Sequence, residues 1–284
     1  SKLGDVFSAD VCGPFDEFFG KYRYYVSFKD HYSKIRFIVF LKRKSDVADA
    51  LKDVIAKVKT QGHVIKEFLS DNGGEFDNEG VRKILRMNGI TQKLTAPYSP
   101  QQNGCSERDN RTIVEMARTL KYSNSEIEFP PAMWAELCST AVYILNRTGK
   151  SSIEVQSPFE VWTGNKPRIK HLRIIGSVSF VHIPDGKRKK MDKKAIKGYL
   201  VGYDGDERYR VYIKEQHKVI LSRDVVFQEK MKDCRDCVEL PRSAASSVQE
   251  PHDSLQQEHH SDSDSADAAS PLSIQYEYDS ESDS

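Results

Sequence analysis

The chain has 284 residues, which is enough for one large domain and a smaller one, and its formal net charge is only +1. Its five cysteines are odd in number and show no disulfide framework, which argues against a disulfide-stabilised secreted protein, and no apolar run approaches the ~20 residues that a membrane helix needs. Residues 231–284 hold 3 Lys or Arg against 13 Asp or Glu, whereas residues 1–230 hold 40 against 29, so a basic part that suits a polyanionic partner is followed by an acidic tail.

The first seventy residues predict strands interrupted by one helix. Three strands are predicted, at residues 5–11, 22–29 and 34–41. Ser45 is the expected N-cap of a helix whose apolar residues recur at helical spacing over 47–58, and Gly62 ends it. A fourth, short apolar strand at 64–69 leads directly to Asp71.

The next segment predicts a helix at 78–87, a strand at 90–94, and an irregular polar loop at 96–104. Two further helices are expected, one beginning at Cys105 and one at 132–146. This order of elements predicts an α/β fold, a mixed sheet flanked by helices, over residues 1–148. Ligand sites in such sheets lie at strand ends, where Asp71 falls.

The second half has a different pattern. A connector at 149–169, rich in glycine and proline, precedes short β segments at 174–183, 195–203, 209–213 and 218–227. This spacing predicts a small all-β barrel over 170–230. The Ser-, Asp- and Glu-rich tail at 231–284 is expected to be disordered, and its isolated Cys234–Cys237 pair lacks the four ligands of a zinc site.

Three acidic residues lie at positions in predicted strands and a helix where a carboxylate could bind a metal ion. Asp10 interrupts an apolar strand, Asp71 ends another, and Glu107 begins a helix, with thirty-five residues between the last two. Two-metal phosphoryl transfer needs clustered carboxylates that hold two divalent ions about 3.5–4 Å apart. Asp10 would bridge both ions, and the other two acids would each complete one. Ordinary strand-end and helix-start acids are the alternative, but an unpaired acid inside an apolar strand is costly.

Two basic clusters are candidates for DNA binding. The first follows the helix that Glu107 begins, and consists of Arg108, Arg111, Arg118 and Lys121. The second lies in the predicted barrel and consists of Lys187, Arg188, Lys189 and Lys190. A solvated helix face explains the first cluster equally well. A nuclear import signal or a solvated hairpin would explain the second.

These segments resemble the integrase of copia-type long-terminal-repeat retrotransposons. The segments that carry the resemblance are 10–14 (DVCGP), 68–76 (FLSDNGGEF), 97–111 (PYSPQQNGCSERDNR), 164–167 (GNKP), 171–173 (HLR), 197–203 (KGYLVGY) and 222–227 (SRDVVF). The resemblance covers residues 1–230 and implies a ribonuclease-H-like core followed by an SH3-like barrel. Because the chain does not begin with Met, we expect it to be a piece of a longer product.

The resemblance implies an activity and partners. The catalytic and metal-binding residues would be Asp10, Asp71 and Glu107, holding two Mg²⁺ or Mn²⁺ ions, with Gln102 and Asn103 added to the DNA contacts. The enzyme would trim the 3′ ends of element DNA and join them to host DNA as a homo-oligomer. It would act in the nucleus after assembly in a cytoplasmic particle, without a membrane partner. The alternatives are a catalytically inactive DNA-binding remnant and a ribonuclease H.

Overall fold

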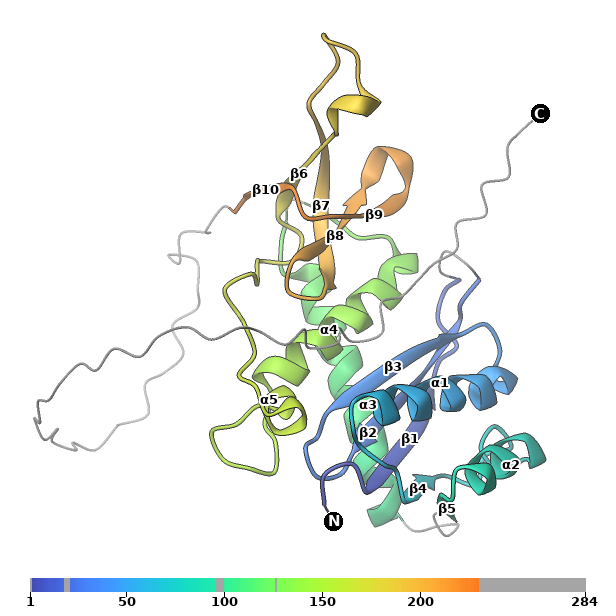
Figure 1. Cartoon of the computed structure of the whole chain (residues 1–284). Coiled ribbons are helices and arrows are strands. Elements are labelled where there is room, and N and C mark those ends of the chain that lie inside the picture. Colours follow the sequence, from blue (N-terminus) through green and yellow to red (C-terminus); the bar gives the residue numbers. More distant parts are fainter. Residues whose placement is uncertain (1, 18–20, 95–99, 126, 230–284) are drawn as a thin grey trace, which may run out of the picture. The chain divides into compact units, whose positions relative to one another are not determined.

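The structure, a computed structural model of the whole chain, describes residues 2–17, 21–94, 100–125 and 127–229; for residues 100–106 and 187 it describes the backbone alone (Figure 1). The described residues all fall within one compact unit. The predicted acidic tail, with Cys234 and Cys237, lies outside them. No helix in the described part has both the length and the apolar character needed to cross a membrane.

The first half of the chain builds a five-stranded mixed sheet in the order β3-β2-β1-β4-β5. Its strands are β1 (Val6–Cys12), β2 (Tyr24–Asp30), β3 (Arg36–Leu41), β4 (Glu67–Ser70) and β5 (Thr91–Leu94). β1 pairs antiparallel with β2 and parallel with β4, so it lies at the centre of the sheet. The predicted mixed sheet is therefore confirmed.

Helices cover both faces of this sheet (Figure 1). They are α1 (Val47–Thr60), α2 (Glu79–Met87), α3 (Pro100–Tyr122) and α4 (Trp134–Thr148). Side chains alternate along a strand, so β2 sends Val26 and Phe28 to the core shared with α1 and α2, and Tyr25 to the core shared with α3 and α4. A short fifth helix, α5 (Pro158–Thr163), adds the buried Trp162 to the first of these cores.

The second sheet is antiparallel throughout, in the order β10-β6-β7-β8-β9. Its strands are β6 (Val178–His182), β7 (Ala195–Asp204), β8 (Arg208–Ile213), β9 (Lys218–Ser222) and β10 (Val225–Gln228). Val181, Val211 and Ile213 form a small core of its own. This confirms the predicted small all-β, SH3-like part.

Three local predictions are corrected by the structure. Ser45 does not cap α1, because a 3-10 turn, Lys44–Asp46, precedes the helix and Asp46 takes the cap position. Residues 100–104 of the predicted loop are helical, since Pro100 takes the first position of α3, where a missing N–H costs nothing. The predicted segment 218–227 is two strands that are separated at Arg223 and Asp224.

A further correction concerns the predicted connector at 149–169, which contains α5. This helix has only six residues, but its signals are clear: the Ser157 hydroxyl accepts a hydrogen bond from the Glu160 N–H, Pro158 takes the first position, and Gly164 ends the helix with φ +76°. The helix is fixed in place by Trp162, whose indole donates to Gln61 Oε1 at 2.8 Å.

Candidate active site

Asp10 lies on the central strand of the mixed sheet, on the face that α3 covers. Alternation along β1 sends Phe7 and Ala9 into the core beneath α1, so Asp10 points to the opposite face. The side chain is half-buried there. A carboxylate in this position is held between the sheet and a helix, where water only partly solvates it.

Asp71 follows directly after β4, the parallel neighbour of β1. The register pairs Ser8 with Leu69, and two more residues along both strands bring Asp71 level with Asp10. Asp71 Oδ1 accepts a hydrogen bond from the Gly73 N–H at 3.1 Å, which fixes the turn. A Cβ atom at Gly73 would lie 2.6 Å from Glu75 Oε2 and 3.0 Å from Asp71 Oδ1, so a side chain there would displace these carboxylates.

Glu107 is exposed near the start of α3, and the next two helical turns are fixed to the sheet by buried polar side chains. Asp109 accepts hydrogen bonds from Lys29 Nζ at 2.6 Å and from Arg36 Nε and Nη2 at 2.9 and 2.7 Å. Asn110 accepts one from Ser27 Oγ at 2.9 Å. These contacts fix the rotation of α3 about its axis, and therefore the face that presents Glu107.

Asn110 also connects α3 to the central acid. Its Nδ2 donates to Asp10 Oδ2 at 3.0 Å. Neither Asp109 nor Asn110 was predicted from the sequence. The spacing of Asn110 from Glu107 was available, because a residue three positions later on a helix shares the face of the first, whereas Asp109, two positions later, points to the other side. Their partners on β2 and β3 are more than seventy residues away, and no local pattern indicates them.

The three acids interact electrostatically. The pKa of Asp10 is raised to about 6, chiefly by burial, next by the negative charge of Asp71 and least by that of Glu107, while the hydrogen bond from Asn110 opposes the rise. Within the described residues, no Lys, Arg or His forms an ion pair with any of these three carboxylates. Among the described residues, the site therefore brings together acids of like charge that no ion pair neutralises, although the charge of Asp71 contributes to raising the pKa of Lys44, which itself pairs with Glu75.

The structure does not contain a preformed metal site at the predicted residues, but the chemistry of these residues suits one. Nowhere in the described part do three His, Cys, Asp or Glu side chains lie together closely enough to hold a metal ion as they stand. The chemistry of the donors nevertheless fits a hard divalent cation, because carboxylate oxygens are the ligands that Mg²⁺ prefers and these are unpaired. A bound cation would remove the repulsion that raises the pKa of Asp10.

The basic candidates on α3 line up behind Glu107. At 100° per residue, Arg111, Arg118 and Lys121 fall within about 80° of one another around the helix, on the side that Glu107 shares. Arg111 and Arg118 are exposed and Lys121 is half-buried. Arg108 is exposed but lies about 100° from Glu107 around the axis. The side chains of Gln102 and Asn103 lie outside the described part.

The basic candidates in the barrel lie between β6 and β7. Lys189 and Lys190 are exposed, whereas Arg188 is half-buried and pairs with Asp185. The side chain of Lys187 is among those not described. Two of the four predicted contacts, Lys189 and Lys190, are thus described and presented to solvent.

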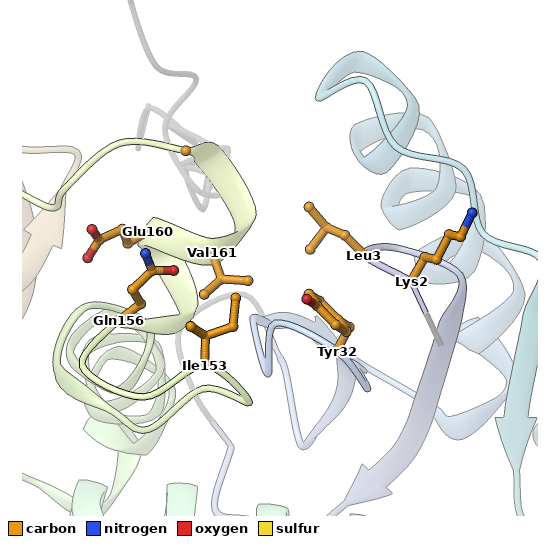
Figure 2. Close-up of a pocket in the computed structure, with 8 residues that line it drawn as sticks. Lys2, Leu3, Tyr32, Ile153, Gln156, Glu160 and Val161 are labelled. Atoms are coloured by element: carbon orange, nitrogen blue, oxygen red, sulfur yellow. The ribbon is translucent and has the colours of Figure 1, made fainter.

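A hollow elsewhere in the fold does not involve any of the predicted site residues. Figure 2 shows Leu3 and Tyr32 facing Ile153 and Val161 across a cavity of about 480 Å³, with Lys2, Gln156, Glu160 and Gly164 also in its lining. Its walls combine apolar side chains with one acid and one lysine. The acid cluster on the mixed sheet is separate from it.

Comparison with known proteins identifies both halves of the chain. The integrase core domain family matches residues 2–100, and the retroviral polymerase SH3-like domain family matches residues 177–238. The chain is 37% identical over 229 residues to the retrovirus-related Pol polyprotein from transposon TNT 1-94 of Nicotiana tabacum, covering 79% of this chain and 17% of that protein. It is 33% identical over 211 residues to the Pol polyprotein from transposon RE2 of Arabidopsis thaliana, covering 74% and 14%.

A solved structure is also similar to part of this chain. The catalytic core domain of BIV integrase is 18% identical, with a TM-score of 0.42, over 57% of this chain and 95% of that one. The chain spans about a sixth of the length of the curated relatives it matches. Both family matches, in the order core then SH3-like domain, agree with the two sheets of the structure. The chain therefore belongs to the integrase family of copia-type retrotransposon Pol polyproteins.

Proposed function

We propose that this chain is a metal-dependent polynucleotidyl transferase that joins the 3′ ends of element DNA to target DNA. The observation that carries the proposal is the grouping of Asp10, Asp71 and Glu107 from three elements, without an ion-pair partner in the described part: burial first, and then the charges of Asp71 and Glu107, raise the pKa of Asp10 to about 6. Structural acids are normally neutralised by a basic neighbour, so this arrangement supports a site that binds cations.

Each acid has a role set by its place in the fold. Asp10 and Asp71 project from neighbouring parallel strands, and Glu107 approaches from α3. Two divalent ions, when bound, would supply the chemistry that activates the attacking hydroxyl or water and stabilises the departing 3′ oxygen. Asn110 orients the Asp10 carboxylate, and Asp109 fixes the helix that brings Glu107 to the site.

The same geometry gives DNA a path beside the acids. Arg111, Arg118 and Lys121 continue from Glu107 along about 20 Å of α3. Lysine and arginine side chains at such spacing neutralise successive phosphates, and this term supplies most sequence-independent affinity for DNA. The SH3-like barrel would add contacts of the same kind through its exposed lysines. The double-stranded partner and assembly as an oligomer on DNA are parts of this proposal, as is action in the nucleus.

The test is a strand-transfer assay with element-end DNA and Mn²⁺. Wild-type protein should give joined products, and Asp71→Asn should reduce them by at least about a thousandfold, since it removes a ligand from the charge-stabilising centre. Asp49→Asn is the matched control, because Asp49 lies on α1, is 79% exposed and pairs with the nearby Lys52. Equal product from wild type and Asp71→Asn would overturn the proposal.

A catalytically inactive DNA-binding remnant is the second candidate. The observation that favours it is the lack of a ready-made metal-holding group among the described residues. Such a protein would bind DNA with strong salt dependence, and its affinity would be the same with chelator, with Mn²⁺ and in Asp71→Asn. Joined products that depend on Mn²⁺ would exclude it.

A further inference from the structure

The hairpin between β6 and β7, residues 183–194, is built as a structured projection, here named the β6–β7 arm. Its base is closed by a hydrogen bond from the Ile183 N–H to the Lys194 carbonyl at 2.9 Å. Its tip is a turn in which the Lys189 N–H donates to Asp192 Oδ2 at 2.7 Å and the Asp192 N–H donates to the Lys189 carbonyl at 3.0 Å. The turn presents the two residues between them, Lys190 and Met191.

The charges of the arm are arranged so that lysines outnumber acids on its described surface. Its two acids are exposed but have partners within the arm, Asp185 in an ion pair with Arg188 and Asp192 as the acceptor of the Lys189 N–H in the turn. The exposed cations are Lys189, Lys190, Lys193 and Lys194. Four exposed lysines within six residues form a strongly positive surface, which attracts a polyanion and is costly to maintain without one.

Met191 is the exception in this charged surface. Its side chain is 97% exposed at the tip of the turn and makes no core contact. Large apolar side chains are exposed singly on many proteins, but this one lies at the foremost point of a basic projection, between Lys190 and Asp192. A flexible, unbranched thioether side chain adapts well to an apolar slot.

We propose that the β6–β7 arm enters the minor groove of duplex DNA and that Met191 wedges between two base pairs there. Lysine side chains bind the flanking phosphates, while an apolar wedge partly unstacks one base step and kinks the duplex. This inference rests on the proposed function and extends it, because the barrel would bend the DNA in addition to contacting its phosphates. An anionic membrane is disfavoured, because one methionine buries too little apolar surface to hold a protein there.

The experiment uses the full 284-residue chain and a 30-base-pair duplex with chelator present. The duplex carries a dye pair at its ends to report bending, and 2-aminopurine at successive positions to report unstacking. Wild type, Met191→Ala, Met191→Leu and Val226→Ala are compared. Val226 is the matched control, because it is a 70% exposed apolar residue on β10 of the same barrel.

Wild-type protein and Val226→Ala should bend the duplex and brighten 2-aminopurine at one step. Met191→Ala should lose both signals and bind about fivefold more weakly, as expected for the loss of one apolar contact, with an unchanged salt dependence. Met191→Leu should retain the bend. The combined substitution of Lys190 and Lys193 by Ala should instead reduce the slope of affinity against salt by about two contacts.

Wild-type bending and unstacking in Met191→Ala would overturn the inference. A different ligand would also overturn it. In that case wild-type protein would bind single-stranded RNA, or vesicles of phosphatidylserine, more tightly than the duplex, and Met191→Ala would abolish this preference. Because no metal is present, the result is separate from the proposed catalysis. A bend that depends on Met191 stands even if no strand transfer is found, and catalysis without such a bend refutes the wedge alone.

Discussion

Carboxylates lie close together in two regions of this molecule, and the two regions differ in whether basic side chains pair with them. Where α4 meets the barrel, Glu136 is fully buried and accepts hydrogen bonds from Arg210 Nε and Nη2 at 2.6 and 2.7 Å. Nearby, Arg147 Nη2 lies 3.1 Å from Asp206 Oδ1, and Arg208 Nη2 lies 2.6 Å from Asp204 Oδ2. At the sheet site, Asp10, Asp71 and Glu107 have no such partner within the described residues.

The difference distinguishes acids that stabilise the fold from acids that are available to bind a ligand. At the junction, each acid is neutralised by the chain itself, because a buried charge is tolerated only when it is paired. At the sheet site, the described residues supply neutral donors, the Asn110 side chain to Asp10 and the Gly73 N–H to Asp71, and no ion pair. The paired acids hold the fold together. The unpaired acids are held by the fold in a state that costs it stability.

The largest expected effect comes from unpairing the junction. Arg210→Met leaves Glu136 charged and without its bidentate partner in a fully buried position, so the free energy of unfolding should fall by about 3–5 kcal/mol. Urea unfolding, followed by tryptophan fluorescence, measures the loss. The double variant Glu136→Gln/Arg210→Met should recover much of it. A loss below about 1 kcal/mol in the single variant would show that the ion pair does not stabilise the junction.

Removing charge at the sheet site should have the opposite sign. The pKa of Asp10 is about 6 in the folded chain against its ordinary 3.8, so between these values the folded state binds more protons than the unfolded state. Stability therefore falls as the pH rises through this window. With chelator at pH 7.5, Asp10→Asn should be more stable than wild type by on the order of 1–3 kcal/mol, and the gain should vanish near pH 3.5.

The comparison of Asp10→Asn with wild type can contradict the expected gain in stability. Urea unfolding of both proteins at the two pH values gives the difference directly, and Asp49→Asn, an exposed acid on α1, should show no gain at either pH. A wild type more stable than Asp10→Asn at pH 7.5 with chelator would mean that Asp10 is compensated by a cation within the chain.

The smallest effect tests Asn110 as a positioning residue. Its hydrogen bond lowers the pKa of Asp10, so Asn110→Ala should raise that pKa above its wild-type value of about 6. Carbon-detected NMR titration of the metal-free protein measures the shift. Asn78→Ala is the matched control, since Asn78 caps α2 through the Val81 N–H and should alter stability without moving the pKa of Asp10. The same shift in both variants would remove Asn110 from the site.

Much of the mixed sheet was predictable because local pattern and tertiary structure agree there. The alternation around Asp10 and the short apolar strand before Asp71 indicate both strands, whereas their parallel pairing, which brings the acids level, is seen only in the structure. The sequence does not reveal Asp109 and Asn110, because their partners Lys29 and Ser27 are distant in the chain. Helix α5 was missed because six residues are too few to show a period.

The barrel was predictable in outline and less so in detail. Evenly spaced apolar segments predict four short β segments where the structure has five strands, because the break between β9 and β10 depends on a turn at Arg223 and Asp224 that the Val- and Ile-rich pattern conceals. The junction with α4 is absent from any local pattern, since Glu136 and Arg210 are paired across 74 residues. The predicted domain boundaries, at 148, 169 and 230, remain predictions.

The central claim is that three acids from β1, from the end of β4 and from α3 converge on divalent cations. Crystals of the protein soaked in Mn²⁺ test it most directly, through anomalous scattering at the manganese edge. Peaks are expected at about 2.1 Å from oxygens of Asp10, Asp71 and Glu107, and they should be lost in Glu107→Gln and Asp71→Asn. Manganese bound elsewhere while these three carboxylates stay apart and unliganded would contradict it.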